Sequence, residues 1–161
     1  SKDLIGEGFF SRAFKAKLTV DGKQTDICVK QLRDDSAKDA FEKEALLAWQ
    51  LTMDPQCHGY FVKLLGVCEE KTALVMELVQ GPSLEKFLSS DKLTENVRWA
   101  IITQIVDGMR RLHEMDIIHR DLKPSNVLLT TPNPTEDDAV RFFSMDLFSI
   151  LVPAIRNLSN S

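Results

Sequence analysis

The segment from His119 to Asn126 constrains the fold of this chain more than any other. It reads His-Arg-Asp-Leu-Lys-Pro-Ser-Asn and follows a stretch with the apolar spacing of a long helix. Asp121 and Asn126 stand five residues apart in it, so we expect a tight loop on which both side chains face the same point. An ordinary polar loop after a helix is the alternative interpretation, but eight residues in this order argue against coincidence.

Composition limits the classes of protein in which this loop can occur. The chain has 161 residues, 43% hydrophobic and 27% charged, which suits the packed core of one domain or of a large part of one. The net charge of -4 gives no reason to expect a nucleic-acid or membrane-surface partner. Cys28, Cys57 and Cys68 lack C-x-x-C spacing, so we expect reduced thiols in a cytosolic or nuclear compartment. No apolar run approaches the roughly 20 residues that span a bilayer, and a start at Ser1 without methionine suggests a longer gene product with upstream segments of its own.

The predicted elements are several strands with one inserted helix, followed by helices. Asp21-Gly22 is a hairpin signal because both residues tolerate positive φ. Ser36 and Thr94 are placed to cap the two longer helices. The predicted strands are residues 12–20, 25–31, 61–68 and 72–78, a short apolar piece follows at 127–129, and the predicted helices are residues 36–51, 84–88 and 94–115. This order indicates an α+β fold with a strand-rich first part.

The loop at residues 119–126 matches the catalytic loop of protein kinases at every defining position. Phosphoryl transfer is mainly positioning and charge neutralisation. The resemblance therefore implies that Asp121 accepts or orients the substrate hydroxyl, that Lys123 neutralises the transferring group and that Asn126 holds a metal ion. Lys123 and Ser125 follow the serine/threonine pattern, and the run Lys-Leu-Leu-Gly-Val-Cys resembles the tyrosine-kinase-like branch of these enzymes.

The glycine-containing segment near the start resembles the phosphate-covering loop of the same family. Ile5, Gly6, Glu7 and Gly8 follow its pattern, and glycines there let backbone N–H groups approach phosphates. A plain β-turn is the alternative. Ser11 and Ala13 replace the usual glycine and valine, so we expect Ser11 to add bulk over the phosphates and Ala13 to leave the adenine less tightly covered.

A lysine in an apolar strand carries the next resemblance. Ile27-Cys28-Val29-Lys30 resembles the Val-Ala-Ile-Lys strand of kinases, with Cys28 in place of alanine. Such a lysine otherwise extends to solvent. The resemblance implies that Lys30 binds the α- and β-phosphates and pairs with a helix glutamate. Glu42 and Glu44 point to different faces of the predicted helix, and the family pattern favours Glu44.

The adenine site follows from the same resemblance. A flat aromatic ligand requires apolar side chains on both of its faces, although several of these residues could equally be plain core. Residues 73–79 resemble the strand that leads to the kinase hinge. They imply that Met76 lies behind the adenine and that the backbone of Glu77 and Val79 hydrogen-bonds its edge. The apolar residues expected above and below the ring are Ile5, Ala13, Cys28 and Leu128.

The second metal ligand of the family is missing in its usual form. No Asp-Phe-Gly follows the loop, and the nearest candidate is Asp146 in Met-Asp-Leu-Phe. A carboxylate there could still hold Mg²⁺, but unrelated sequence is an equal alternative. No activation segment follows it, so we expect the apolar face of residues 97–112 to lack its covering helices and to be exposed.

Together these motifs resemble a C-terminally truncated, two-lobed protein kinase domain. We expect a complete N-lobe over residues 1–79 and a partial C-lobe over residues 80–161. The implied function is transfer of the γ-phosphate of ATP to a serine or threonine hydroxyl of a protein, with Mg²⁺ as cofactor. The alternatives are an impaired, pseudokinase-like module that binds ATP or regulates a partner, and a product without a stable fold. The implied partners are ATP, a protein substrate and a regulatory protein, and the implied location is the cytoplasm or the cytoplasmic side of a membrane.

Overall fold

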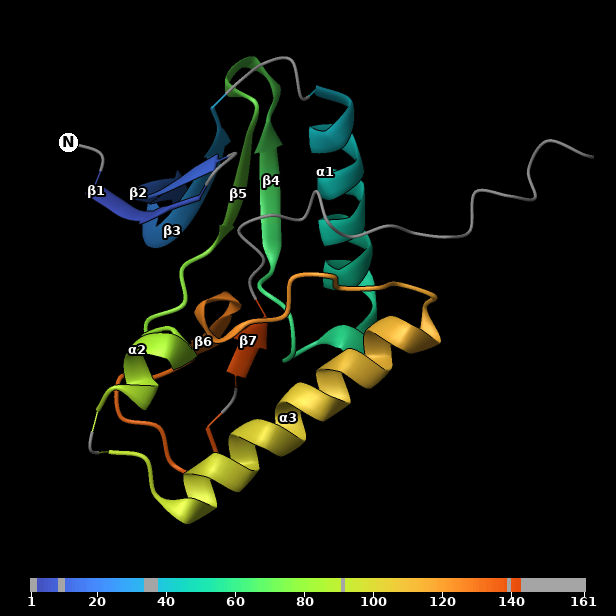
Figure 1. Ribbon diagram of the computed structural model, residues 1–161. Coiled ribbons are helices and arrows are strands. Elements are labelled where there is room, and N and C mark those ends of the chain that lie inside the picture. The colour runs from blue at the N-terminus through green and yellow to red at the C-terminus, as the bar shows by residue number, and fades with distance from the viewer. Residues whose placement is uncertain (1–2, 9–10, 34–37, 91, 139, 143–161) are drawn as a thin grey trace, which may run out of the picture.

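The computed structural model describes residues 3–8, 11–33, 38–90, 92–138 and 140–142 (Figure 1). Ser36, the expected helix cap, and Asp146, the candidate metal ligand, lie outside these residues. Within them, an antiparallel sheet is followed by a helical part, and the chain passes from one to the other just after β5 (Ala73–Glu77).

Five strands form the sheet. Its two longest strands are joined by Asp21 and Gly22, which adopt the positive φ angles (49° and 76°) of a two-residue hairpin turn. The predicted hairpin is therefore confirmed. In spatial order the strands are β1 (Asp3–Glu7), β2 (Ser11–Val20), β3 (Lys23–Leu32), β5 and β4 (Leu64–Cys68).

Helix α1 (Lys38–Met53) lies beside β4 (Figure 1) and connects the two parts of the core. Phe41 is buried in a cluster with side chains of β2, β3, β4 and β5. Leu47 and Leu51 are buried in a second cluster, which is built mainly from the helical part. The apolar spacing that predicted this helix therefore corresponds to residues that anchor it on both sides.

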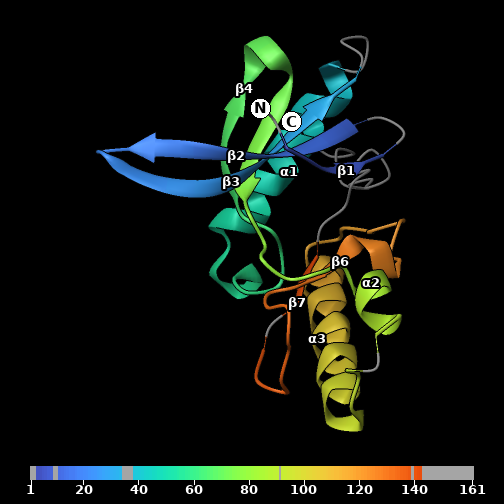
Figure 2. The same cartoon turned by 90° about the vertical axis from the view of Figure 1, so that its left-hand side faces the viewer.

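Hydroxyl side chains cap the first two helices of the helical part, and the predicted cap at Thr94 is one of them. Ser83 Oγ accepts from the Lys86 N–H at 3.4 Å, and Thr94 Oγ1 accepts from the Val97 N–H at 3.3 Å. Figure 2 shows the long helix α3 below the short pair of strands β6 and β7. The elements are α2 (Leu84–Leu88), α3 (Glu95–Glu114), β6 (Val127–Leu129) and β7 (Val140–Phe142), with single 3₁₀ turns η2 (Pro55–Cys57), η3 (Glu69–Lys71) and η4 (Pro124–Asn126) along the chain.

The face of α3 that we expected to be exposed is buried. Val97, Ile101 and Leu112 are 6%, 5% and 1% exposed. They pack in one cluster with residues of α1, α2 and β6. The prediction was wrong because segments before and after α3 in the chain cover this face, so no later helix is needed for it. The exposed apolar side chains of α3 stand at other positions, namely Trp99, Ile102 and Val106.

The α+β fold predicted from the order of the elements is confirmed, with the sheet first and the helices after it. None of the helices described here is both long enough and apolar enough to cross a membrane. The junction between the sheet and the helical part, where β5 leads towards α2, is the place where the candidate site lies.

Candidate active site

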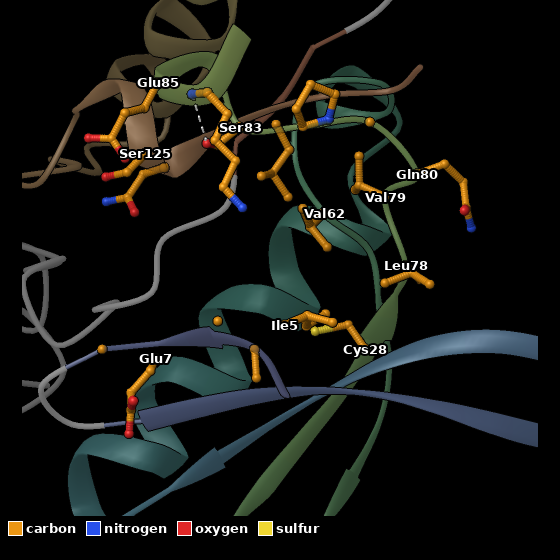
Figure 3. A pocket seen from close by; sticks show the side chains of 18 of the residues that line it. Ile5, Glu7, Cys28, Val62, Leu78, Val79, Gln80, Ser83, Glu85 and Ser125 are labelled. Carbon is orange, nitrogen blue, oxygen red and sulfur yellow. Dashed lines mark hydrogen bonds between the residues drawn. The ribbon is translucent and has the colours of Figure 1, made fainter. Parts of the chain in front are cut away.

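A cavity of about 640 Å³ lies where the sheet meets the helical part (Figure 3). Its wall combines the end of β1, the segment from β5 to α2 and the loop before β6. This volume falls within the range of small-molecule sites, roughly 300–1,000 Å³. The lining residues that the sequence pointed to are Ile5, Gly6, Gly8, Ala13, Cys28, Glu77, Val79, Lys123, Asn126 and Leu128.

The sheet side of the cavity is apolar. Ala13 and Cys28, from neighbouring strands, are 2% and 6% exposed and line it. Burial raises the pKa of the Cys28 thiol to about 11, and the charge of Lys30 offsets this only in part. The thiol is therefore neutral at physiological pH and contributes to the wall as an apolar group. Val62 also lines the cavity (Figure 3).

The glycine-containing loop reaches the cavity with its backbone. Gly6 and Gly8 both line it, and the Gly8 N–H donates to the carbonyl oxygen of Ser11 at 2.9 Å. Ser11 itself is fully buried and is not among the described residues that line the cavity. Ser11 shares a face of β2 with Ala13, which lines the cavity, and the added bulk over the phosphates stays a prediction.

A buried ion pair joins the sheet to α1 behind the cavity. Lys30 Nζ donates to Glu44 Oε1 at 2.6 Å, and both side chains are 1% exposed. Glu42 is exposed, so the choice of Glu44 as the partner agrees with the structure. Alternate residues of a strand share a face, so Lys30 lies on the same face of β3 as Cys28, which lines the cavity.

The end of β5 forms the back of the cavity. Met76 is 3% exposed and stands opposite Cys28 in the sheet, in the core and not in the cavity wall. Glu77 lines the cavity, yet its N–H donates to the Lys63 carbonyl at 3.0 Å and its carboxylate accepts from the Lys63 N–H at 3.0 Å. Val79, two residues further along the chain, also lines the cavity.

The segment after Val79 supplies wall residues that the sequence did not indicate. A Cβ on Gly81 would lie 2.2 Å from the Leu129 carbonyl oxygen and 2.5 Å from that of Thr131, so only glycine lets the chain pass this close to β6. The Leu129 N–H donates to the Pro82 carbonyl at 2.9 Å. The Gly-Pro pair at residues 81 and 82 was the available sequence signal for this approach. The lining residues that were missed are Glu7, Val62, Leu78, Gln80, Gly81, Pro82, Ser83, Glu85, Lys86 and Ser125.

Three side chains of the loop before β6 form one hydrogen-bonded unit. Asn126 Nδ2 donates to Asp121 Oδ2 and to the Asp121 carbonyl, each at 2.8 Å, and Lys123 Nζ lies 2.9 Å from Asp121 Oδ2. Burial opposes ionisation of Asp121, but hydrogen bonds from Lys123 and Asn126 and the nearby charges hold its pKa below the usual value. Asp121 is therefore a carboxylate at neutral pH, fixed next to two residues that line the cavity.

The buried His119 side chain stabilises the loop through a hydrogen bond to its backbone. Its side chain is 3% exposed, and its Nδ1 accepts from the Asp121 N–H at 3.3 Å. Burial lowers the pKa of His119, which favours the neutral ring that such an acceptor requires. Arg120 adopts a positive φ of 60°, which turns the chain between His119 and Asp121.

Asn126 fits the role of a metal ligand. It is 1% exposed, and its Oδ1 is buried without a hydrogen-bond partner among the described residues. A carboxamide oxygen is a ligand type that hard cations accept. In the described part of the chain, no group of three or more His, Cys, Asp or Glu side chains could hold a metal, and Asp146 lies outside that part.

Comparison with known proteins gives one consistent family. The family model described as "Protein kinase domain" matches residues 1–141. A cysteine-rich receptor-like protein kinase 37 of Arabidopsis thaliana is 37% identical over 159 residues, which covers 90% of this chain and 23% of the relative. A putative L-type lectin-domain containing receptor kinase V.8 of the same plant is 35% identical over 137 residues, covering 80% and 21%. A serine/threonine-protein kinase H1 homolog of Pinctada fucata is 31% identical over 134 residues, covering 81% and 31%. This chain thus spans about a quarter of the length of these relatives.

Proposed function

Because this chain belongs to the protein kinase family, we propose that it binds Mg-ATP in the cavity and transfers the γ-phosphate to a serine or threonine hydroxyl of a protein. The observation that carries the proposal is the unit of Asp121, Lys123 and Asn126 at the cavity wall. It combines an ionised carboxylate, a cation 2.9 Å from it, and a carboxamide that donates to the carboxylate through its nitrogen. The buried oxygen of that carboxamide has no hydrogen-bond partner among the described residues. Phosphoryl transfer needs these groups in one place.

The apolar part of the cavity would hold the adenine. Ala13 and Cys28 offer a buried apolar surface on the sheet side, and Leu128 comes from the helical side. The segment around Glu77 and Val79 would hydrogen-bond the edge of the ring. Because the Glu77 N–H is already bonded to Lys63, we assign the ring contacts to the Glu77 carbonyl and to the backbone of Val79.

Charged and polar groups would bind the phosphates of ATP. Lys30 would bind the α- and β-phosphates while Glu44 keeps its ammonium group in place at 2.6 Å. Gly6 in β1 and Gly8 directly after it leave room for phosphate oxygens to meet backbone N–H groups. The buried Oδ1 of Asn126 would ligate Mg²⁺, with Asp146 as the candidate second ligand. When bound, the metal ion neutralises charge on the phosphate oxygens.

Asp121 would act on the substrate hydroxyl. Its low pKa keeps it ionised at neutral pH, and its hydrogen bond from Asn126 fixes its orientation. Asp121 orients the hydroxyl and accepts its proton as the hydroxyl oxygen bonds to the γ-phosphorus and the bond to ADP breaks. Lys123, which lines the cavity, neutralises the charge on the phosphoryl group in transit.

The impaired, pseudokinase-like alternative is not favoured. Lys30, Asp121 and Asn126 are all present, and the relatives carry the names of kinases. On the names of the receptor kinases among those relatives, we also propose action in the cytoplasm or at its membrane side. The boundary between the two lobes is proposed at residues 79 and 80, where the sheet gives way to the helical part.

The test is phosphate transfer by the purified chain from radiolabelled ATP to a mixture of serine and threonine peptides. Asp121→Asn should lose about a hundredfold to ten-thousandfold in transfer rate and keep nucleotide binding. Asp116→Asn is the matched control, because Asp116 is exposed in the turn before the loop and outside the cavity wall. Nucleotide binding without transfer by the unmodified chain would favour a regulatory module, and equal rates for Asp121→Asn would remove Asp121 from the mechanism.

A further inference from the structure

We propose that Glu7, together with Arg12 and Arg33, is a positioning residue that holds the end of β1 and Gly8, which follows it, at the cavity wall. The three side chains form an ion cluster on the surface of the sheet. The effect of this ion cluster on nucleotide release rests on the proposed function, whereas its effect on the opening of residues 3–8 does not.

One carboxylate oxygen binds both arginines. Arg12 Nε donates to Glu7 Oε1 at 3.1 Å, and Arg33 Nη2 donates to the same oxygen. Glu7 is the last residue of β1, Arg12 lies near the start of β2, and Arg33 directly follows β3. The cluster therefore ties three successive strands together at the end where the loop leaves the sheet.

Strand β1 lies at the edge of the five-stranded sheet. Among the strands that the structure describes it pairs with β2, and the pairing shifts register between Leu4 and Gly6. Leu4 and Ile5 are 51% and 46% exposed, so little apolar burial fixes the strand. Because edge strands without a buried face are the first to open, the ion cluster adds to the pairing with β2 that holds this one.

Arg12 lies on the face of the sheet that points away from the ion pair of Lys30, whereas Glu7 is also part of the cavity wall. Arg12 stands opposite Glu7 on one side and opposite Gln31 on the other. Neighbouring residues of a strand point to opposite faces, so Arg12 points away from the side of Ala13 and Lys30. The arginines thus act through the backbone of Gly6, in β1, and of Gly8, directly after β1, both of which line the cavity.

The expected effect is modest because the side chains are half exposed, with 49% for Glu7, 52% for Arg12 and 37% for Arg33. Exposed ion pairs change a local equilibrium by about twofold to fivefold. The effect should fade in about 1 M salt, where charges are screened over a few ångströms.

The experiment compares Glu7→Gln, Arg33→Gln and the double variant with Asp26→Asn. Asp26 of β3 forms an ion pair of 2.9 Å with Lys15 of β2, and their side chains are 36% and 40% exposed. Neither residue lines the cavity. Two quantities are measured: amide hydrogen exchange of a peptide spanning residues 3–8, and the dissociation rate of a fluorescent ATP analogue with Mg²⁺.

Glu7→Gln and Arg33→Gln should each speed exchange of this peptide by about twofold to fivefold. The double variant should not exceed Glu7→Gln, because both changes break the same cluster. Asp26→Asn should leave exchange unchanged, and all four variants should keep the melting temperature. Unchanged exchange in Glu7→Gln would overturn the proposal, whether or not the chain binds nucleotide.

The dissociation rate separates positioning from simple attraction of phosphates. The two single variants change the net charge in opposite directions, so a pure charge effect would slow release in Glu7→Gln and speed it in Arg33→Gln. A loop held by the cluster predicts faster release in both. Opposite changes would overturn the proposal. Absence of nucleotide binding by the unmodified chain would instead refute the proposed function, and the exchange data would still decide the role of the cluster.

Discussion

Glu44→Gln should lower the free energy of unfolding by about 3–5 kcal/mol, the cost of leaving a buried charge without its partner. Lys30 Nζ lies 2.6 Å from Glu44 Oε1, and both side chains are 1% exposed, so water cannot take the place of the carboxylate. Glutamine keeps the shape of glutamate and one acceptor oxygen. The loss therefore measures charge compensation and not packing.

The change is large enough to be measured in urea. With a slope of about 2 kcal/mol per molar urea, a loss of this size moves the unfolding midpoint by about 2 M. The double variant Lys30→Met/Glu44→Leu removes both charges and should be as stable as the unmodified chain or more so, because apolar residues commonly replace a buried ion pair without loss. Asp26→Asn, which breaks the exposed pair with Lys15, is the control and should give no measurable shift.

Urea unfolding followed by circular dichroism decides between the outcomes. A midpoint for Glu44→Gln close to that of the unmodified chain would refute the reasoning, because removal of the carboxylate charge would then cost little stability. A double variant as unstable as Glu44→Gln would also refute it, because packing would then explain the loss. A stable double variant that no longer binds nucleotide would show that the pair serves phosphate binding more than stability.

Three further predictions follow from single sites. Burial lowers the pKa of His119, so the contribution of His119 to stability is complete above the unfolded pKa of about 6.5 and declines as the pH falls below that value. The free energy of unfolding should therefore depend less on pH in His119→Gln, and an identical pH profile would contradict this. Gly81→Ala should lower the free energy of unfolding by about 1–3 kcal/mol through overpacking, since its Cβ would lie 2.2 Å from the Leu129 carbonyl oxygen. A Cβ at Gly66 would meet nothing within 4 Å, so Gly66→Ala should keep its melting temperature in the same thermal melt. Cys28, with its pKa raised to about 11 by burial, should be only about one part in a thousand thiolate at pH 8 and should react with iodoacetamide far more slowly than a free thiol peptide; comparable rates would contradict its burial.

Local signals in the sequence predicted most of the elements. The Asp21-Gly22 turn and the Thr94 cap appear where the residue types require them, because backbone preference and capping act over a few residues. The strand β4 begins at Leu64 and not at residue 61, since boundaries depend on pairing with β5. The match to a kinase loop pointed to Asp121 and Asn126, whose hydrogen bond spans only five residues.

The sequence by itself determined the family, the order of strands and helices and the identity of the charged groups, because each depends on residues close together in the chain. Only the tertiary structure decided that the face of α3 containing Val97 and Ile101 is covered, that Val62 and the segment around Gly81 complete the cavity, and that Glu7 joins Arg33 across three strands. These contacts join distant parts of the chain, and whether two such parts meet depends on how all the elements pack together. Charge and hydrophobicity show that a residue needs a partner, and the packing of the fold determines which partner it finds.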